Sequence, residues 1–351
     1  MTQNDRLRVA VGNPLPEALC DLVERLEPRV QMVREQSLLP PMRWAGDFQG
    51  DPAFRRSAGE EAAFDALLDS AEVLYGIPDA EPTALARAVR ANPRLRWVQT
   101  MAAGGGAQVK AADLSRDELD RVVVTTSAGV HAGPLAEFSI FGLMAGAKHL
   151  PRLLAQQSER RWSGRWAMDQ LSEQTVLVVG LGHIGREVAR KAAALGARVI
   201  GVHRRELDVE GVERVVGPEK LAEVAPEVDG VVMTLPGTEA TFQLLDEAFF
   251  EALRPGATLV SVGRGTVIDE DALVAALQAG RVGFAALDVF AVEPLPEDSP
   301  LWSLPNVVLT PHTAANSEHE ERLIAELFAD NARRFLDGEP LRNVVDTVDF
   351  Y

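Results

Sequence analysis

The sequence predicts an α/β protein made of doubly wound parallel sheets. Short runs of β-branched and other apolar residues alternate along the chain with helical stretches, and this alternation is typical of parallel sheets. The 351 residues are enough for two domains of ordinary size. Hydrophobic residues make up 46% of the chain and charged residues 25%, which is close to the globular average and favours folded domains over disorder.

The first series of elements occupies the N-terminal third of the chain. Apolar runs predict strands at 7–11, 30–33, 72–75, 96–101 and 121–125. Helices are expected between them, for example over 82–91. Residues 38–59 interrupt this rhythm with proline, glycine and aromatic residues, and a loop of that length in a compact domain is usually functional or disordered.

A second α/β series follows a long apolar stretch that we expect to form one helix over 134–150, with proline at its start. A polar segment with tryptophans (156–174) comes next. Strands are expected at 175–179, 198–202, 229–234, 258–262, 283–287 and 307–310. The last helix is expected over 317–336, ending before the natural cap Gly338, and the tail that follows is expected to pack back on the first domain.

The net charge and the cysteine content indicate which partners the protein can bind and which cellular compartment it occupies. The net charge of −17 argues against binding nucleic acid, and it requires that any phosphorylated cofactor meet locally placed positive groups or helix N-termini. The single cysteine, Cys20, excludes an intrachain disulfide, and we expect no metal site. The start shows no signal-peptide pattern, and the most apolar stretch, 138–147, is far shorter than the roughly 20 residues of a membrane span. A cytoplasmic protein with no membrane partner is expected.

A glycine motif points to a dinucleotide. The apolar run at 175–179 leads into Gly180, Gly182 and Gly185 in the pattern G-x-G-x-x-G, and a helix is expected to follow. In such a turn the first glycine permits the tight bend, the second lets the backbone approach a pyrophosphate, and the third lets helix and strand pack closely. The pyrophosphate then lies at the helix N-terminus. We assign His183 and Ile184, inside the motif, to the same site.

The end of the next strand bears on which dinucleotide binds. An acidic residue there would bond the adenosine ribose of NAD. This sequence has His203, Arg204 and Arg205 instead, and two adjacent arginines can hold a 2′-phosphate. NADP is therefore the preferred cofactor and NAD a possible one; the alternative is that both arginines are solvated surface residues.

Four chemically useful side chains follow successive strands of the second series. They are Arg264, Asp288, Glu293 and His312. Ligands of doubly wound sheets bind beyond the carboxyl ends of the strands, so these residues could converge. An arginine can hold a substrate carboxylate, an imidazole can protonate a forming alkoxide, and a carboxylate on its other nitrogen can fix the tautomer. Taken singly, each has a plain alternative: a salt bridge, a solvated loop residue or a satisfied core histidine.

The chain resembles the D-isomer-specific 2-hydroxyacid dehydrogenase family, most clearly from Arg96 to Asn316. The motifs that carry the resemblance are WVQTMAAGGG, AGVHAGPLAEF, VLVVGLGHIGREVA, LRPGATLVSVGRGTVIDEDALVAAL, AALDVFAVEPLP and NVVLTPHTA. The resemblance implies that Arg264, Glu293 and His312 are catalytic and that Asp288 contacts the nicotinamide amide.

The same resemblance implies how the domains are arranged. A Rossmann cofactor domain, 129–316, would be inserted into a flavodoxin-like substrate domain, 1–128 with 317–351. The cofactor site also takes in Leu235, Pro236, Val262 and Gly263. A turn in the first domain would offer its backbone N–H groups to the substrate; its residues are Ala102, Ala103, Gly104 and Gly105. Members of the family are commonly homodimers through the cofactor domain, with the segment around Trp162 and Trp166 as an arm.

Three departures from the family pattern bear on substrate choice. Ser261 stands where Asn is frequent, and Ala-Gly-Gly-Gly replaces the usual small-Gly-x turn, which suggests a wider or more mobile pocket. The insertion 38–59 is either a surface flap or a lid whose Trp44, Phe48 or Phe54 touches substrate.

The function expected from the sequence is hydride transfer between NAD(P)H and a small 2-oxo acid, as in glyoxylate or hydroxypyruvate reductases. Two alternatives stay open because fold does not fix substrate. One is a family member acting on formate or phosphite. The other is a non-catalytic, dinucleotide-sensing protein on the same fold, which need not keep Arg264, Glu293 and His312 together.

Overall fold

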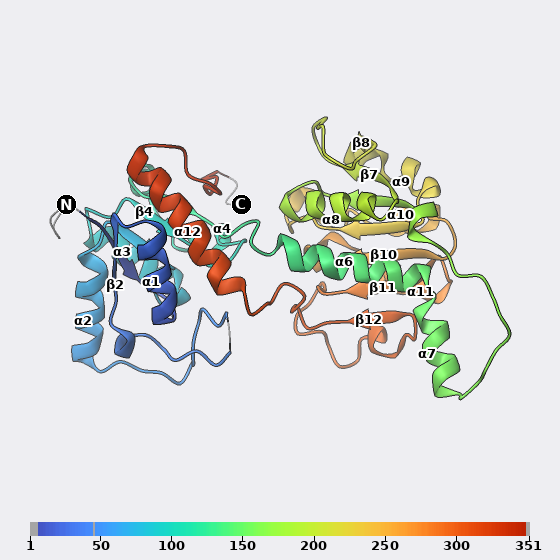
Figure 1. The fold of residues 1–351 in the computed structure, drawn as a ribbon, viewed down its shortest axis with the longest axis horizontal. Coiled ribbons are helices and arrows are strands. Elements are labelled where there is room, and N and C mark those ends of the chain that lie inside the picture. The colour runs from blue at the N-terminus through green and yellow to red at the C-terminus, as the bar shows by residue number, and fades with distance from the viewer. Residues whose placement is uncertain (1–5, 45, 349–351) are drawn as a thin grey trace. The chain divides into compact units, whose positions relative to one another are not determined.

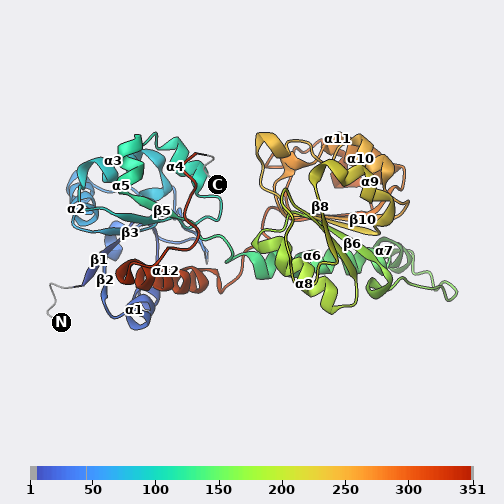
Figure 2. The same cartoon turned by 90° about the horizontal axis from the view of Figure 1, so that it is seen from above.

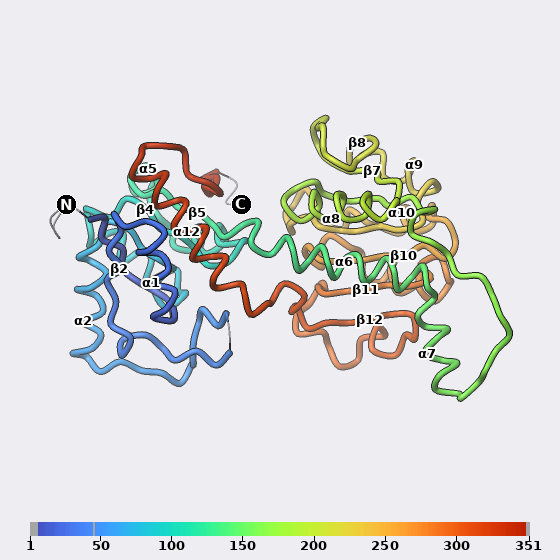
Figure 3. The backbone as a smooth tube through the Cα atoms, viewed as in Figure 1, coloured from blue at the N-terminus to red at the C-terminus, as the bar shows by residue number. Residues whose placement is uncertain are grey.

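The chain folds into two compact units in a computed structural model, which describes residues 6–44 and 46–348 (Figure 1). Unit 1 comprises residues 1–131 and 316–351, and unit 2 comprises Ala132–Ala315. The chain therefore leaves unit 1 once and returns to it once, as the tube in Figure 3 traces. The boundaries expected from the sequence were 128/129 and 316/317.

Unit 1 is built on a five-stranded sheet in the order β2-β1-β3-β4-β5, with every pair parallel. The strands are β1 (Leu7–Val11), β2 (Val30–Val33), β3 (Val73–Tyr75), β4 (Trp97–Gln99) and β5 (Val123–Thr125). This is the flavodoxin-like order, in which the direction of winding reverses between β1 and β3.

Helices cover both faces of this sheet because a parallel sheet is apolar on both sides. In Figure 2, α1 and α12 lie on one face and α3, α4 and α5 on the other. The helices of the unit are α1 (Glu17–Leu26), α2 (Ala58–Asp69), α3 (Pro82–Ala91), α4 (Gly106–Ala111), α5 (Arg116–Arg121) and α12 (Glu320–Asp337). The fully buried Trp97 stacks on Phe328 of α12, with ring centroids 4.8 Å apart, so the returning chain completes the core.

Unit 2 is built on a seven-stranded parallel sheet in the order β12-β11-β10-β9-β6-β7-β8. Its strands are β6 (Thr175–Val179), β7 (Arg198–Val202), β8 (Arg214–Val216), β9 (Gly230–Met233), β10 (Ala257–Ser261), β11 (Val282–Leu287) and β12 (Val307–Leu309). Counted from β6, this is the Rossmann order extended by one strand, with the winding reversed between β6 and β9. The predicted fold class, two doubly wound parallel sheets, is confirmed.

The long helix expected over 134–150 is α6 (Ala132–Ala147), which ends three residues earlier than expected. The α-helices of unit 2 are α6 (Ala132–Ala147), α7 (Leu150–Ser158), α8 (His183–Ala194), α9 (Leu221–Val224), α10 (Glu247–Ala252) and α11 (Glu270–Gln278). The break falls at His149, whose φ of 52° is left-handed and cannot continue a right-handed helix. The predicted end was three residues too late because the apolar pattern runs on through this turn.

The segment 38–57 is fastened to unit 1. The Asn13 side chain donates a 2.9 Å hydrogen bond to the Phe48 carbonyl, and Phe48 packs against the core. The buried Arg56 holds Asp79 with both terminal nitrogens, at 2.9 and 2.8 Å. Trp44 remains more than half exposed. The described residues of this segment, 38–44 and 46–57, are thus held against unit 1 by hydrogen bonds and apolar packing.

The tail returns along β5, as expected. The N–H of Thr126 donates to Asn343, and the N–H of the buried Val345 donates to Val124, at 2.9 and 2.8 Å. Within residues 6–44 and 46–348, no helix combines the length and the apolar character needed to cross a membrane.

Candidate functional site

The glycine turn between β6 and α8 has the geometry that its three glycines predict. Gly180 takes a φ of 102°, which residues with a side chain rarely adopt. A Cβ added at Gly182 would meet no atom within 4 Å, whereas one at Gly185 would lie 1.8 Å from the Gly180 carbonyl oxygen. Gly185 therefore permits the helix to touch the turn, and Gly182 leaves open space for an approaching ligand.

These residues fit the pyrophosphate of a dinucleotide. Helix α8 begins at His183, and its N-cap Gly182 supplies no side-chain hydrogen bond to the first N–H groups. Unpaired N–H groups and the helix dipole favour an anion at that end. His183 is exposed and Ile184 half-buried in this first turn. A bound dinucleotide would place its pyrophosphate on these N–H groups.

The second part of the predicted cofactor site lies at the end of β7. The Arg205 N–H donates to Nδ1 of His203 at 3.1 Å, which folds His203–Arg205 into a short turn. The side chains of Arg204 and Arg205 are both exposed. The turn thus presents two arginines to solvent at the strand end where a ribose-binding acid is expected in NAD sites.

The ends of β9 and β10 pack against the glycine turn. The Thr234 hydroxyl donates to the Gly180 carbonyl at 3.0 Å, and a Cβ on Gly180 would lie 2.9 Å from a Leu235 methyl carbon. A Cβ on Gly263 would lie only 2.4 Å from the Leu235 carbonyl oxygen. The peptides Leu235-Pro236 and Val262-Gly263 are therefore brought together beside the turn, as the sequence predicted.

Arg264 directly follows this contact. Its side chain is exposed, and its Nη1 donates to the Gly263 carbonyl at 2.8 Å. The next residue, Gly265, packs on a different loop, because a Cβ there would lie 1.9 Å from the Phe290 carbonyl carbon. The missing side chain of Gly265 thus lets the Arg264 turn touch the loop that carries Glu293.

Glu293 and His312 form a hydrogen-bonded pair. Oε2 of Glu293 lies 2.7 Å from Nδ1 of His312. The other carboxylate oxygen of Glu293 accepts from the Phe290 N–H at 3.0 Å, and Glu270 holds the adjacent Ala291 N–H at 3.1 Å. With Nδ1 engaged by Glu293, Nε2 is the nitrogen of His312 that can exchange a proton with a ligand.

The surroundings of Glu293 keep it charged. Partial burial acts to raise its pKa, but the hydrogen bonds from His312 and from the Phe290 N–H, together with the charges of His312 and Arg264, outweigh that effect. The net pKa of Glu293 lies below the ordinary value of a glutamate.

Asp288 lies at the end of β11 and is 1% exposed. Its Oδ1 accepts from the hydroxyl of Thr310 and from the N–H groups of Thr313 and Ala314, at 2.7, 2.8 and 2.9 Å. The sequence assigned Asp288 to the nicotinamide amide alone. Its bonds to the loop around His312 were not foreseen, because they join residues that only the sheet brings together.

The predicted substrate turn belongs to unit 1. Ala102, Ala103 and Gly104 are exposed at the end of β4, and the Thr100 hydroxyl donates to the Ala102 carbonyl at 3.0 Å. A Cβ on Gly105 would lie 2.0 Å from the Thr100 hydroxyl oxygen, so the turn requires glycine there. Gly105 is itself buried and its N–H donates to the Ala102 carbonyl at 3.3 Å, so the N–H of Gly105, which the sequence assigned to the substrate, serves the turn instead.

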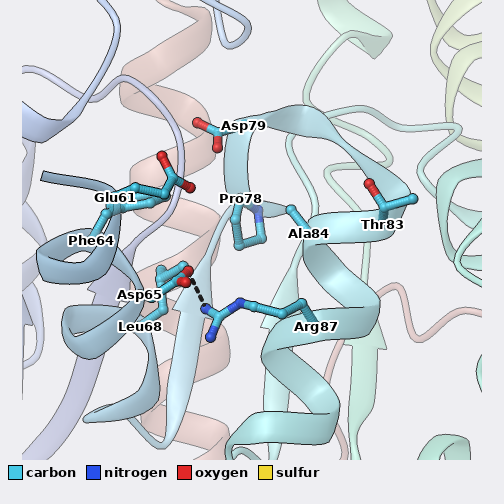
Figure 4. A pocket seen from close by; sticks show the side chains of 9 residues that line it. All are labelled: Glu61, Phe64, Asp65, Leu68, Pro78, Asp79, Thr83, Ala84 and Arg87. Atoms are coloured by element: carbon cyan, nitrogen blue, oxygen red, sulfur yellow. Dashed lines mark ion pairs between the residues drawn. The ribbon is translucent and has the colours of Figure 1, made fainter. Parts of the chain in front are cut away.

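Unit 1 also contains a hollow that gathers none of the predicted site residues. It lies between α2 and α3, measures about 220 Å³, and is lined by Glu61, Asp65, Asp79 and Arg87 among others (Figure 4). Arg87 pairs with Asp65 at 2.9 Å. Among the described residues, no group of His, Cys, Asp or Glu side chains could hold a metal ion.

Cys20 is buried in unit 1, and its burial raises the pKa of the thiol to about 12. A thiol that stays protonated at neutral pH is a poor nucleophile and metal ligand, so Cys20 is a core residue.

Comparison with known proteins identifies the family. Residues 140–314 match the family model described as D-isomer specific 2-hydroxyacid dehydrogenase, NAD binding domain. The glyoxylate reductase of Korarchaeum cryptofilum is 35% identical over 270 residues, which span 74% of this chain and 79% of that enzyme. The chain belongs to the D-isomer specific 2-hydroxyacid dehydrogenase family. The matched NAD-binding stretch lies within unit 2.

Other members of this family that resemble the chain have different activities or bound ligands. A D-isomer specific 2-hydroxyacid dehydrogenase from Xanthobacter autotrophicus Py2, solved in complex with NADPH and MES, is 29% identical with a TM-score of 0.76. That similarity covers 99% of this chain and 100% of the other. The D-3-phosphoglycerate dehydrogenase of Archaeoglobus fulgidus is 33% identical over 64% of this chain but only 43% of its own length.

Proposed function

We propose that the protein is an NADPH-dependent reductase of small 2-oxo acids, with glyoxylate and hydroxypyruvate as the leading substrates. The observation that carries the proposal is the 2.7 Å bond between Glu293 and His312, on a loop that packs against Gly265, the residue after Arg264. A sensor protein has no need of such a pair. The substrate class is supported by the 35% identity to a glyoxylate reductase.

In the proposed reaction each member of the trio has one task. Arg264 binds the substrate carboxylate and polarises the neighbouring carbonyl with its fixed positive charge. NADPH, when bound, supplies the hydride to the carbonyl carbon. His312 donates its Nε2 proton to the oxygen on which negative charge develops. Glu293 holds the ring through Nδ1, which fixes its orientation and leaves Nε2 as the nitrogen that transfers the proton.

Arg204 and Arg205 are proposed to select NADPH by binding its 2′-phosphate. Their support is the exposed pair of arginines at the end of β7, without the acidic residue that NAD sites carry there. The similar Xanthobacter protein was solved with NADPH. NADH is expected to serve as the poorer cofactor.

We further propose that unit 2 binds the cofactor and unit 1 the substrate, through the exposed turn Ala102–Gly104. A homodimer formed through unit 2 is also proposed. Its support is the apolar surface around the arm: the side chains of Trp162, Leu154 and Phe141 are 101%, 52% and 46% exposed. A cytoplasmic location completes the proposal, in line with a single buried cysteine.

The test is a set of initial rates with NADPH and NADH, measured in parallel over 2-oxo acids from glyoxylate to branched and aromatic ones. We expect turnover with the small acids and a higher kcat/KM with NADPH. Replacing Arg204 and Arg205 together by alanine should weaken NADPH far more than NADH. Arg190→Ala, which removes an exposed arginine paired with Glu187, is the matched control and should leave the ratio unchanged.

Other outcomes would redirect the proposal. Equal losses for the two cofactors would show that Arg204 and Arg205 do not read the 2′-phosphate. Tight dinucleotide binding without turnover of any 2-oxo acid would refute the substrate class. It would favour formate or phosphite as the substrate, or a non-catalytic sensing role.

A further inference from the structure

The buried carboxylate of Asp288 ties down the loop that carries His312. One of its oxygens, Oδ1, receives three hydrogen bonds: one from the side chain of Thr310, two residues before His312, and two from the N–H groups of Thr313 and Ala314, just after it. The Asp288 N–H in turn donates to Ser261 at the end of β10. Oδ1 of Asp288 thus holds the loop by hydrogen bonds on both sides of His312. The backbone of Asp288 is itself hydrogen-bonded to the sheet.

These hydrogen bonds are needed because His312 has an unfavourable backbone conformation. Its φ is 53°, in the left-handed region that costs energy for any residue with a side chain. Such a conformation persists only where the surrounding structure fixes it. Both flanks of His312 are held by Asp288, so the direction in which the imidazole leaves the backbone depends on that carboxylate.

We propose that Asp288 is a positioning residue for His312, acting through Thr310 and the two N–H groups. This inference rests on the proposed function. It differs from the contact with the nicotinamide amide that the family resemblance implies, because it uses Oδ1 for the protein's own loop and leaves that contact to the other carboxylate oxygen. Loss of the hydrogen bonds to Oδ1 therefore slows proton donation by His312 without weakening the binding of the dinucleotide.

Thr310→Val isolates this role, because valine keeps the shape of threonine and removes only the hydroxyl that donates to Asp288 at 2.7 Å. Misplacing a catalytic group by a fraction of an ångström to 1 Å costs roughly 10- to 100-fold. We expect kcat/KM to fall about tenfold, with the Kd for NADPH unchanged within twofold and a larger solvent isotope effect on kcat. Thr310→Ser restores the hydroxyl and should restore the rate.

Thr175→Val is the control for the cost of removing a threonine hydroxyl. Thr175 is a buried threonine at the first position of β6, at the opposite end of the strands from the site, and its replacement should leave kcat/KM unchanged.

A second measurement needs neither cofactor nor activity. Amide hydrogen exchange of the free protein reports directly on the bonds to Thr313 and Ala314. We expect faster exchange over 310–316 in Asp288→Ala, and near-normal protection in Asp288→Asn, since asparagine retains one oxygen in place of Oδ1.

The outcomes separate this inference from the proposed function. Wild-type kcat/KM in a folded Thr310→Val protein, or unchanged exchange in Asp288→Ala, would overturn the positioning role. A lower melting temperature with unchanged kcat/KM would overturn the positioning role as well. Absence of turnover in the wild-type protein would refute the proposed function, and the exchange experiment would still decide whether Asp288 holds the loop.

Discussion

Gly265→Ala should separate Arg264 from the Glu293–His312 pair. The added Cβ would lie 1.9 Å from the Phe290 carbonyl carbon, against an ordinary contact distance of at least 3.4 Å. The two loops must therefore part by about 1.5 Å at this point. Since a misplacement of 1 Å can cost a factor of about 100, we expect kcat/KM for glyoxylate or hydroxypyruvate to fall by at least that factor.

The assay compares kcat/KM, the Kd for NADPH and the melting temperature of the wild-type and Gly265→Ala proteins. The Kd should change little, because the glycine turn at the start of α8 is not touched. Gly59→Ala is the control: the added Cβ meets no atom within 4 Å, so the rate should stay the same and the stability should stay equal or rise slightly. A folded Gly265→Ala protein with near-wild-type kcat/KM would refute the geometric reasoning.

Three further predictions concern other parts of the site and the core. Glu293→Gln should lower kcat/KM about 10³-fold, since it replaces the carboxylate that fixes the tautomer and orientation of His312. Because the pKa of Glu293 lies below its usual value, the wild-type contribution of this carboxylate should persist to a more acidic pH than that of an ordinary glutamate, and a pH–rate profile checks this. Gly182→Ala should weaken NADPH more than tenfold in a titration while leaving the melting temperature unchanged, whereas Gly185→Ala should lower the melting temperature, because only the second Cβ meets the protein. Phe328→Ala should destabilise unit 1 by about 3–5 kcal/mol in chemical denaturation, as expected for a fully buried phenylalanine; a smaller loss would show that the core rearranges to fill the space.

Local signals were sufficient to predict most of the architecture. Strands β6 and β7 begin and end at the predicted residues, because their apolar runs are bounded by polar or glycine residues on both sides. The Gly180–Gly185 turn also follows from sequence, since each glycine has a separate steric reason. Strand β8 (Arg214–Val216) was not predicted: one exposed and two half-exposed residues at a sheet edge have no distinctive pattern.

The features that the sequence could not predict depend on contacts between distant residues. The glycine at 265 is visible in the sequence, but the Phe290 peptide that occupies the place of its side chain is not. The sequence predicts that Asp288 contacts the cofactor. Its three hydrogen bonds to the His312 loop, however, exist only because β11 and β12 are neighbours. The break at His149 is similar, since an apolar pattern does not reveal a single left-handed residue.

The most direct test of the proposed activity is a single-turnover experiment with hydroxypyruvate, comparing the wild-type protein with His312→Gln at saturating NADPH. The account predicts rapid oxidation of NADPH by the wild type and a rate about 10³-fold lower in the variant, with the same Kd for NADPH in both. No oxidation by the wild type, or equal rates in the two proteins, would contradict the claim that His312, held by Glu293, donates the proton in the reduction of a 2-oxo acid.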